Sequence, residues 1–297
     1  MPAVVVDDLH KSFGSVVALA GVSFTAAEGE CVAILGPNGA GKTTALEVLE
    51  GYQRRDSGRV EVLGTDPSHA TRDWRQGIGI VLQSTAVDPY LTVREVLTRN
   101  ASYYRAPRAV VEVISLIGLE EKADVRVHRL SGGQQRRLDV GLGIVGRPRL
   151  LFLDEPTTGF DPSARREAWQ LVRDLRTLGT TILLTTHYMD EAQVLADRIV
   201  IVAAGQVVAM GTPDDLGGRD TAAVRIRFRL PPDVDASSLP VMATPTVHGY
   251  ELTTDDEVRV LHALTGWALE HGVPLIGLTA DRPSLEDVYL RLVQAGS

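Results

Sequence analysis

Short apolar runs rich in β-branched residues alternate along the chain with segments whose apolar residues recur at helical spacing. The runs at residues 31–35, 149–154 and 181–186 predict buried strands, because they are almost wholly apolar and short. Alternation of strand and helix indicates a parallel α/β sheet. Further strands are expected at residues 4–6, 16–24, 59–63, 79–82 and 198–202, and a helix at 42–50.

The middle of the chain, about residues 88–147, has a mostly helical pattern. Thr92 can cap a helix, with Glu95 three residues later as its capping-box partner. Apolar residues at helical spacing over 110–119 predict a second helix that stops at Gly118. We therefore expect a helical insertion on the sheet core.

The composition shifts at Gly217 and Gly218. Beyond them, residues 224–229 alternate strictly between apolar and arginine, which predicts a half-buried strand of an antiparallel sheet. A helix at 258–270, a strand at 273–279 and a last helix opened by Ser284 and running to 293 follow. We therefore predict a first domain at 1–218 and a small α+β domain at 219–297.

The bulk properties restrict the class of protein. The chain has 297 residues, which suits two domains, and its formal charge of −8 does not suggest the basic face of a nucleic-acid binder. The single cysteine, Cys31, cannot form an intrachain disulfide and fits a reducing cytoplasm. Acidic residues come too early in 1–8 for a secretory signal, and no apolar run reaches the roughly 18 residues that a membrane span needs. If the protein serves transport across a membrane, we expect another chain to supply the passage.

One glycine-rich stretch, residues 36–43, fits the phosphate-binding pattern G-x-x-x-x-G-K-[ST] between a predicted strand and a predicted helix. Glycines let backbone N–H groups turn toward phosphate oxygens, and the helix N-terminus adds partial positive charge. Lys42 would bridge the β- and γ-phosphates of ATP, and Thr43 would hold Mg²⁺ through its hydroxyl. The expected ATP-contacting residues of this loop are Asn38, Gly39, Ala40, Gly41, Lys42, Thr43 and Thr44.

Two carboxylates, Asp154 and Glu155, end the predicted strand at 149–154. Ligands of parallel α/β sheets gather at the carboxyl ends of the strands. We expect Asp154 to bind Mg²⁺, directly or through water, and Glu155 to polarise the water that attacks the γ-phosphate. The chain is therefore predicted to hydrolyse a nucleoside triphosphate.

A third motif, Leu130-Ser131-Gly132-Gly133-Gln134, lies between the phosphate loop and the two carboxylates. In this order and spacing the motifs resemble those of ATP-binding subunits of ABC transporters, over about residues 3–216. The resemblance implies an α/β fold of the P-loop NTPase (RecA-like) type, with a parallel sheet core, an antiparallel β subdomain and a helical insertion. Within that family the chain looks most like the ATPase of ABC-2-type exporters, the daunorubicin-resistance kind, because of Arg137-Leu138-Asp139 and the tail Pro283-Ser284-Leu285-Glu286-Asp287-Val288-Tyr289.

The resemblance also implies roles for single residues. Gln83 would sense Mg²⁺ and contact the membrane partner, His187 would hold the γ-phosphate, and Asp161 would cross a dimer interface. Phe13, where the family usually has a tyrosine, would stack on adenine with Val17 beside it. In the second copy of a homodimer, Ser131, Gly132, Gly133 and Gln134 would face the γ-phosphate.

The resemblance thus implies an ATPase subunit at the cytoplasmic face of the cell membrane, peripheral to it. It would drive export of a drug, antibiotic or lipid through separate transmembrane permease subunits. Two alternatives stay open, an importer ATPase and a regulatory ABC ATPase without a membrane partner.

Overall fold

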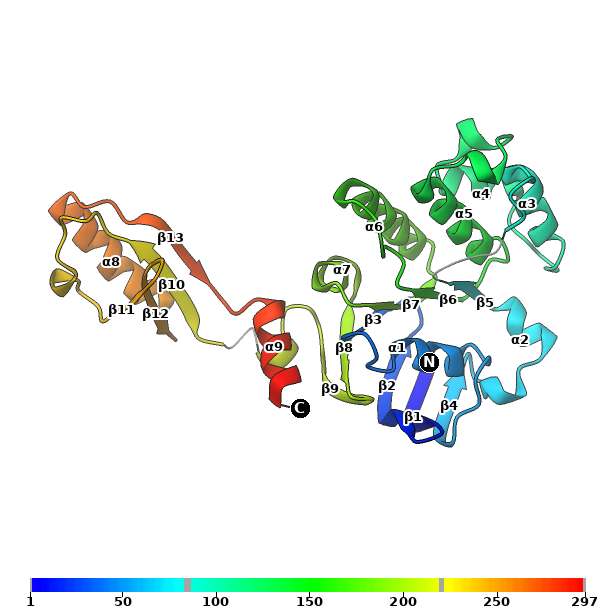
Figure 1. Cartoon of the computed structure of the whole chain (residues 1–297), viewed down its shortest axis with the longest axis horizontal. Helices are drawn as coiled ribbons and strands as arrows, with labels where there is room; N and C mark the ends of the chain where they lie inside the picture. The colour runs from blue at the N-terminus through cyan, green and yellow to red at the C-terminus, as the bar shows by residue number, and fades with distance from the viewer. Residues whose placement is uncertain (1, 83–86, 219–221, 296–297) are drawn as a thin grey trace. The chain divides into compact units, whose positions relative to one another are not determined.

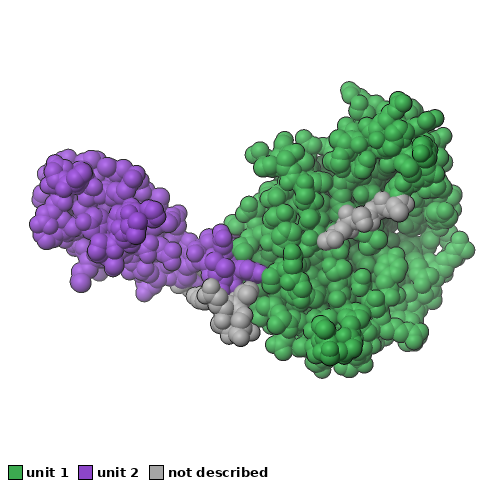
Figure 2. All heavy atoms as spheres, in the orientation of Figure 1, with its two compact units in different colours: residues 1–213, 293–297 green, residues 214–292 purple. Residues whose placement is uncertain are grey.

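The computed structural model describes residues 2–82, 87–218 and 222–295. Contacts divide the chain into two compact units (Figure 2). Unit 1 comprises residues 1–213 and 293–297, and unit 2 comprises residues 214–292. The boundary falls close to the glycine pair at 217 and 218, where the composition of the sequence changes.

The centre of unit 1 is a six-stranded sheet in the order β5-β6-β7-β3-β8-β9. All neighbouring strands are parallel except β9, which runs antiparallel to β8. Strands β3, β6 and β7 are buried along their whole length, as the uninterrupted apolar runs of the sequence predict. The strands are β3 (Cys31–Leu35), β5 (Ile78–Val81), β6 (Leu150–Asp154), β7 (Thr181–Thr186), β8 (Arg198–Ala203) and β9 (Gln206–Gly211).

A second, antiparallel sheet has the order β2-β1-β4. It is formed by β1 (Pro2–Phe13), β2 (Val16–Ala27) and β4 (Ser57–Val62). Helix α1 (Lys42–Leu49) lies between the two sheets, as Figure 1 shows. One apolar cluster joins these three layers, with Val6 and Phe24 from the antiparallel sheet, Leu46 from α1 and Phe152 from the parallel sheet. The core thereby holds the loop before α1 against the ends of the central strands.

Helices α6 (Pro162–Thr177) and α7 (Met189–Leu195) cover the other face of the parallel sheet (Figure 1). The helical insertion contains α3 (Val93–Ala101), α4 (Val110–Leu116) and α5 (Gly132–Ile144). Thr92 and Glu95 form the capping box at the start of α3 that their spacing predicts. Shorter elements of unit 1 are α2 (Arg72–Gln76) and the 3-10 turns Pro67–His69, Glu120–Lys122 and Val127–Arg129.

Unit 2 contains a four-stranded antiparallel sheet in the order β11-β12-β10-β13. Val224, Ile226 and Phe228 of β10 pack in one apolar cluster with Leu264 of α8, so one face of the sheet is covered by this helix. The strict alternation over 224–229 is therefore correctly interpreted as a half-buried strand. The elements are β10 (Val224–Arg229), β11 (Thr244–Thr246), β12 (Gly249–Thr254), α8 (Glu257–His271), β13 (Ile276–Asp281) and α9 (Leu285–Ala295), with 3-10 turns at Leu216–Gly218 and Ala236–Ser238.

Some elements differ from the sequence-based prediction. Strand β1 extends over twelve residues, although only the apolar core at 4–6 was expected, because pairing with both β2 and β4 continues past its polar end. Strands β9, β11 and β12 were not predicted. β9 and β12 are mostly half-exposed, β11 is exposed, and their residues lack a clear apolar alternation. Ser284 caps α9 through hydrogen bonds with Asp287, as expected.

Candidate nucleotide site

The phosphate loop, residues 36–43, connects β3 to α1 at the carboxyl end of the parallel sheet. Gly41 has a φ of 99°, and a Cβ there would lie 2.4 Å from the carbonyl oxygen of Ala18, so this turn requires glycine. The Lys42 side chain is buried, and its ammonium donates to the carbonyl oxygens of Gly36 at 2.9 Å and Pro37 at 3.1 Å. A buried cation surrounded by turned backbone suits a phosphate group.

Asp154, at the end of β6, lies opposite the first turn of α1. The Thr43 hydroxyl is 3.3 and 3.4 Å from the two carboxylate oxygens of Asp154. Thr185 at the end of β7 donates its hydroxyl to Asp154 Oδ1 at 2.6 Å and so fixes the orientation of the carboxylate. A carboxylate beside a threonine hydroxyl is the oxygen donor set that Mg²⁺ prefers, so these residues fit the expected ion.

Glu155 has a φ of 44°, in the left-handed region that non-glycine residues rarely adopt. Its Oε1 lies 3.5 Å from Lys42 Nζ and 3.2 Å from His187 Nδ1, and its Oε2 accepts from Thr158 at 3.0 Å. Burial alone would raise the pKa of Glu155, but hydrogen bonds from His187 and Thr158 and the charges of His187 and Lys42 hold the pKa below its usual range. Of the three expected catalytic side chains, Lys42 and His187 thus lie beside the ionised carboxylate of the third, Glu155.

The signature segment, residues 130–134, lies at the start of α5. The Ser131 hydroxyl accepts from the backbone N–H of Gln134, and the Gln134 side chain accepts from the N–H of Ser131, so the segment caps α5. Ser131, Gly132, Gly133 and Gln134 line a surface pocket of about 710 Å³ together with Asp161, which caps α6. No residue of the phosphate loop lines this pocket in the described part of the chain.

The remaining expected residues lie at the surface or outside the described chain. Phe13 and Val17 are 45% and 59% exposed at the end of the β1–β2 pair, so Phe13 is not a core residue. Lys11 Nζ lies 5.1 Å from the centre of the Phe13 ring. Asn38 and Gly39 are exposed at the tip of the phosphate loop, Ala40 is buried and Thr44 half-buried. Gln83 lies outside the described residues.

Two side chains at the site were not singled out in the sequence. Thr185 accepts from the N–H of Glu155 at 3.0 Å in addition to holding Asp154. Arg136 of α5 is buried and donates to the carbonyl oxygens of Pro156 at 3.1 Å, Asp154 at 3.2 Å and Leu82. The only sequence signal for Thr185 is its place just before Thr186 and His187, and a single arginine next to another gives no signal of burial.

Comparison with known families gives two matches. The family described as ABC transporter matches residues 19–158. A second family, described as the C-terminal domain of ABC transporter domain-containing protein-like proteins, matches residues 224–284. The first range contains the phosphate loop, the signature segment and both carboxylates, and the second contains the sheet of unit 2 and α8.

Relatives with assigned names match along almost the whole chain. The linearmycin resistance ATP-binding protein LnrL of Bacillus subtilis is 34% identical over 96% of this chain and 96% of its own length. The daunorubicin resistance ATP-binding protein DrrA2 of Streptomyces coeruleorubidus is 37% identical over 98% of this chain and 94% of its own length. The Nod factor export ATP-binding protein I of Rhizobium sp. is 40% identical over 96% of this chain and 94% of its own length.

Solved structures support the same assignment. The ATP-binding cassette MJ1267 in its ADP conformation has a TM-score of 0.64 and 26% sequence identity to this chain. The match covers 72% of this chain and 92% of the MJ1267 chain. The dimeric cassette MJ0796, bound to ADP and Pi after hydrolysis, has a TM-score of 0.63 and 26% identity over 70% of this chain and 98% of its own. The predicted fold class, P-loop NTPase, is thereby confirmed. The chain belongs to the ATP-binding subunits of ABC transporters, as its phosphate loop, its signature segment and its paired carboxylates indicate.

Proposed function

We propose that this protein is the ATP-hydrolysing subunit of an ABC exporter and works as a homodimer around two ATP molecules. One observation carries the proposal. Lys42 and His187 lie 3.5 and 3.2 Å from the carboxylate of Glu155, whereas Ser131 and Asp161 line a surface pocket to which no described residue of the phosphate loop contributes. A capped helix start with two glycines offers N–H groups to an anion, and a second copy can supply these groups to the γ-phosphate. The dimer of MJ0796 supports this arrangement.

The residues divide the work of hydrolysis between them. The Lys42 ammonium, which donates hydrogen bonds to two carbonyl oxygens of its own loop, lies where it can bind phosphate oxygens. Glu155, kept ionised at neutral pH, orients the attacking water and accepts its proton, and His187 donates to the γ-phosphate. Thr43 and Asp154 would hold Mg²⁺, which supplies charge compensation at the β- and γ-phosphates when bound.

The adenine would lie on the exposed Phe13 ring, with Val17 beside it. A ring face stacks on any base, and a phenyl group lacks the hydroxyl that could read a base edge. We therefore expect only a modest preference for ATP over GTP.

The transport partner is a separate permease. No helix in the described part of the chain is long and apolar enough to cross a membrane. The relatives are named for resistance to linearmycin and daunorubicin and for Nod factor export, which favours export over import. We place the subunit at the cytoplasmic face of the membrane, with its helical insertion at 88–147 and Gln83 toward the permease.

We assign residues 1–218 to the nucleotide-binding domain and 219–297 to an accessory domain that stabilises or regulates the dimer. The match of residues 224–284 to a family of C-terminal domains supports this division. Removal of residues 219–297, followed by light scattering with ATP, tests the assignment. Unchanged dimerisation together with an unchanged ATPase rate would reject it.

A pair of variants tests the dimer mechanism. Glu155→Gln keeps the shape of the side chain but removes the base, so with ATP it should elute as a stable dimer and hydrolyse no ATP. Adding Ser131→Glu places a negative charge where the phosphate of the partner copy would lie, so the double variant should bind ATP and stay monomeric. Ser102→Glu, at an exposed serine after α3, is the matched control and should leave the dimer intact. Near-normal hydrolysis by Glu155→Gln, or a dimer that tolerates Ser131→Glu, contradicts the proposal.

A further inference from the structure

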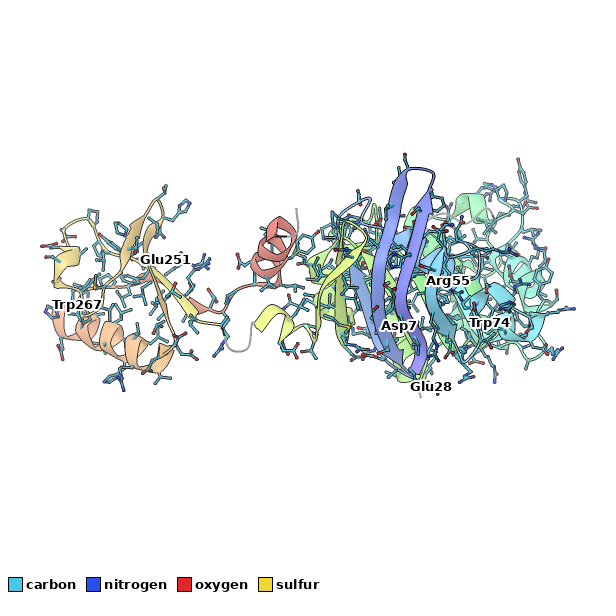
Figure 3. All side chains as sticks on the ribbon, turned by 90° about the horizontal axis from the view of Figure 1, so that it is seen from below. Asp7, Glu28, Arg55, Trp74, Glu251 and Trp267 are labelled. Atoms are coloured by element: carbon cyan, nitrogen blue, oxygen red, sulfur yellow. The ribbon has the colours of Figure 1, made fainter. Side chains whose placement is uncertain are left out.

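The sheet of unit 2 has one face that α8 does not cover. Arg225, Arg227 and Arg229 of β10 lie on this face, since the alternate residues of the strand are buried against the helix. Figure 3 shows Glu251 on the side of the sheet away from α8, where Trp267 is labelled. The three arginines therefore form a row along the open face.

The carboxylates of this face are concentrated at one end of the row. Arg225 lies 3.6 Å from Glu251, and Arg227 lies 3.3 Å from Asp281. Asp287 also feels the charge of both arginines, which together with its hydrogen bonds to Ser284 holds the pKa of Asp287 low. Among the described residues no carboxylate forms an ion pair with Arg229, so positive charge is left uncompensated at the other end of the row.

A pocket of about 580 Å³ lies at this uncompensated end. Arg227, Arg229, His248 and Thr279 supply nitrogen and oxygen donors, and Val247 and Ile276 supply apolar walls. No aspartate or glutamate lines the pocket in the described chain. This is unusual for the unit, because residues 214–292 carry thirteen acidic and only seven basic side chains.

The backbone is shaped around Arg229. Gly249, at the start of β12, has a φ of 131°, and a Cβ there would lie 2.6 Å from Arg229 Cγ. The aliphatic part of Arg229 therefore lies directly over this glycine. On the other side, the pairing of β10 with β13 shifts register between Arg227 and Arg229, so that Arg229 pairs with Ile276. Gly249 of β12 and the register shift against β13 thus both lie beside Arg229.

We propose that this pocket binds a phosphate-bearing ligand with an apolar substituent. Two guanidinium groups, an imidazole and a hydroxyl offer more donors than a carboxylate can accept, and they suit the unesterified oxygens of a phosphate group. The apolar side chains at the rim, Val247 at 96% and Ile276 at 43% exposure, suit a hydrocarbon group next to the phosphate. The site lies wholly in unit 2 and is independent of the nucleotide site of unit 1 and of the proposed function.

Two sources supply this chemistry, a free organic phosphate and the headgroup of an anionic phospholipid. The full-length chain is used for both tests, in a Lys42→Ala background that weakens phosphate binding by unit 1. The first probe is phenyl phosphate, titrated calorimetrically. The second is co-sedimentation with vesicles of phosphatidylglycerol compared with vesicles of phosphatidylcholine.

The variant is Arg229→Gln, and the matched control is Arg259→Gln. Arg259 is also an exposed arginine of unit 2, at the start of α8, and its loss changes the net charge equally. Arg229→Gln should weaken binding about tenfold or more, because it removes a charge-assisted contact, whereas Arg259→Gln should leave binding unchanged. Equal melting curves of the two variants show that the fold is intact.

The outcomes separate the readings. Binding of phenyl phosphate that depends on Arg229 identifies a free phosphate, and Arg229-dependent binding to phosphatidylglycerol vesicles alone identifies a lipid headgroup. Absence of both kinds of binding overturns the proposal. An equal effect of the two substitutions also overturns it, because binding would then depend on net charge and not on the pocket.

Discussion

Arg136 provides the most direct test of how the site is held together. Its buried guanidinium donates to three carbonyl oxygens, those of Leu82 at the end of β5 and of Asp154 and Pro156 on either side of Glu155. Arg136→Gln is too short to reach any of them. The variant therefore separates the start of the signature helix from the strand end that carries Asp154 and Glu155.

The loss in the free energy of unfolding caused by Arg136→Gln follows from the contacts that it removes. Hydrogen bonds that involve a charged group contribute about 1.5–3 kcal/mol each, so three of them set an upper limit of about 9 kcal/mol. Arg136 also lines a surface pocket of about 790 Å³, so water can reach some of the released carbonyl groups. We therefore expect a loss of about 3 kcal/mol, at the lower end of the range for breaking a buried charged contact.

Arg137→Gln is the matched control. The Arg137 guanidinium forms an ion pair at 2.5 Å with Glu167, whose side chain is 57% exposed. Such surface pairs contribute at most about 1 kcal/mol to the free energy of unfolding. Urea unfolding is followed by tryptophan fluorescence in a Trp267→Phe background, because Trp74 and Trp169 then report on unit 1 alone. If Arg136→Gln and Arg137→Gln lose the same stability, the three carbonyl contacts do not hold the site.

Three further predictions concern single side chains. Burial, with the charge of Asp154, raises the pKa of Glu50 to about 8. The folded chain therefore keeps a proton on Glu50 that the unfolded chain releases above about pH 4.5. As a result, the free energy of unfolding falls as the pH rises between these two values. Glu50→Gln should therefore remove a loss of up to about 4 kcal/mol in the free energy of unfolding between about pH 5 and pH 9; parallel pH profiles of variant and parent would contradict this. Burial raises the pKa of the Cys31 thiol to about 12, so a thiol reagent should label it only after denaturation, and rapid labelling of the native chain would show that β3 opens. Thr185→Val removes the hydroxyl that orients Asp154 and accepts from the N–H of Glu155, so kcat should fall about tenfold with little change in the binding of ATP without metal; an unchanged kcat would show that the carboxylates need no such support.

The sequence predicts those parts of the molecule that depend on local chemistry. The strands at 31–35 and 150–154 were recognised because they are buried on both faces and need apolar residues throughout. The phosphate loop was recognised because only glycine suits the turn at Gly41. Thr92 and Ser284 were identified as helix caps because capping involves residues three positions apart.

The parts that were missed depend on contacts between distant segments. The strand order β5-β6-β7-β3-β8-β9 is set by packing across the whole sheet, and no local pattern encodes it. Arg136 looks like a surface residue in the sequence, yet it is buried because three carbonyl groups from elsewhere in the chain surround it. Strand β12 pairs with β10 and with β11 through its backbone, and side chains that are exposed in β11 and mostly half-exposed in β12 give no alternation to detect.

The backbone of Glu155 has a consequence for how this position can vary. A left-handed residue with a Cβ costs about 1–2 kcal/mol, and glycine would remove that cost. With Glu155 as the proposed base, folding favours a residue that cannot perform the reaction, and turnover requires a residue that this backbone tolerates poorly. Replacement of Glu155 by glycine would therefore yield a more stable chain that still binds nucleotide but does not hydrolyse it.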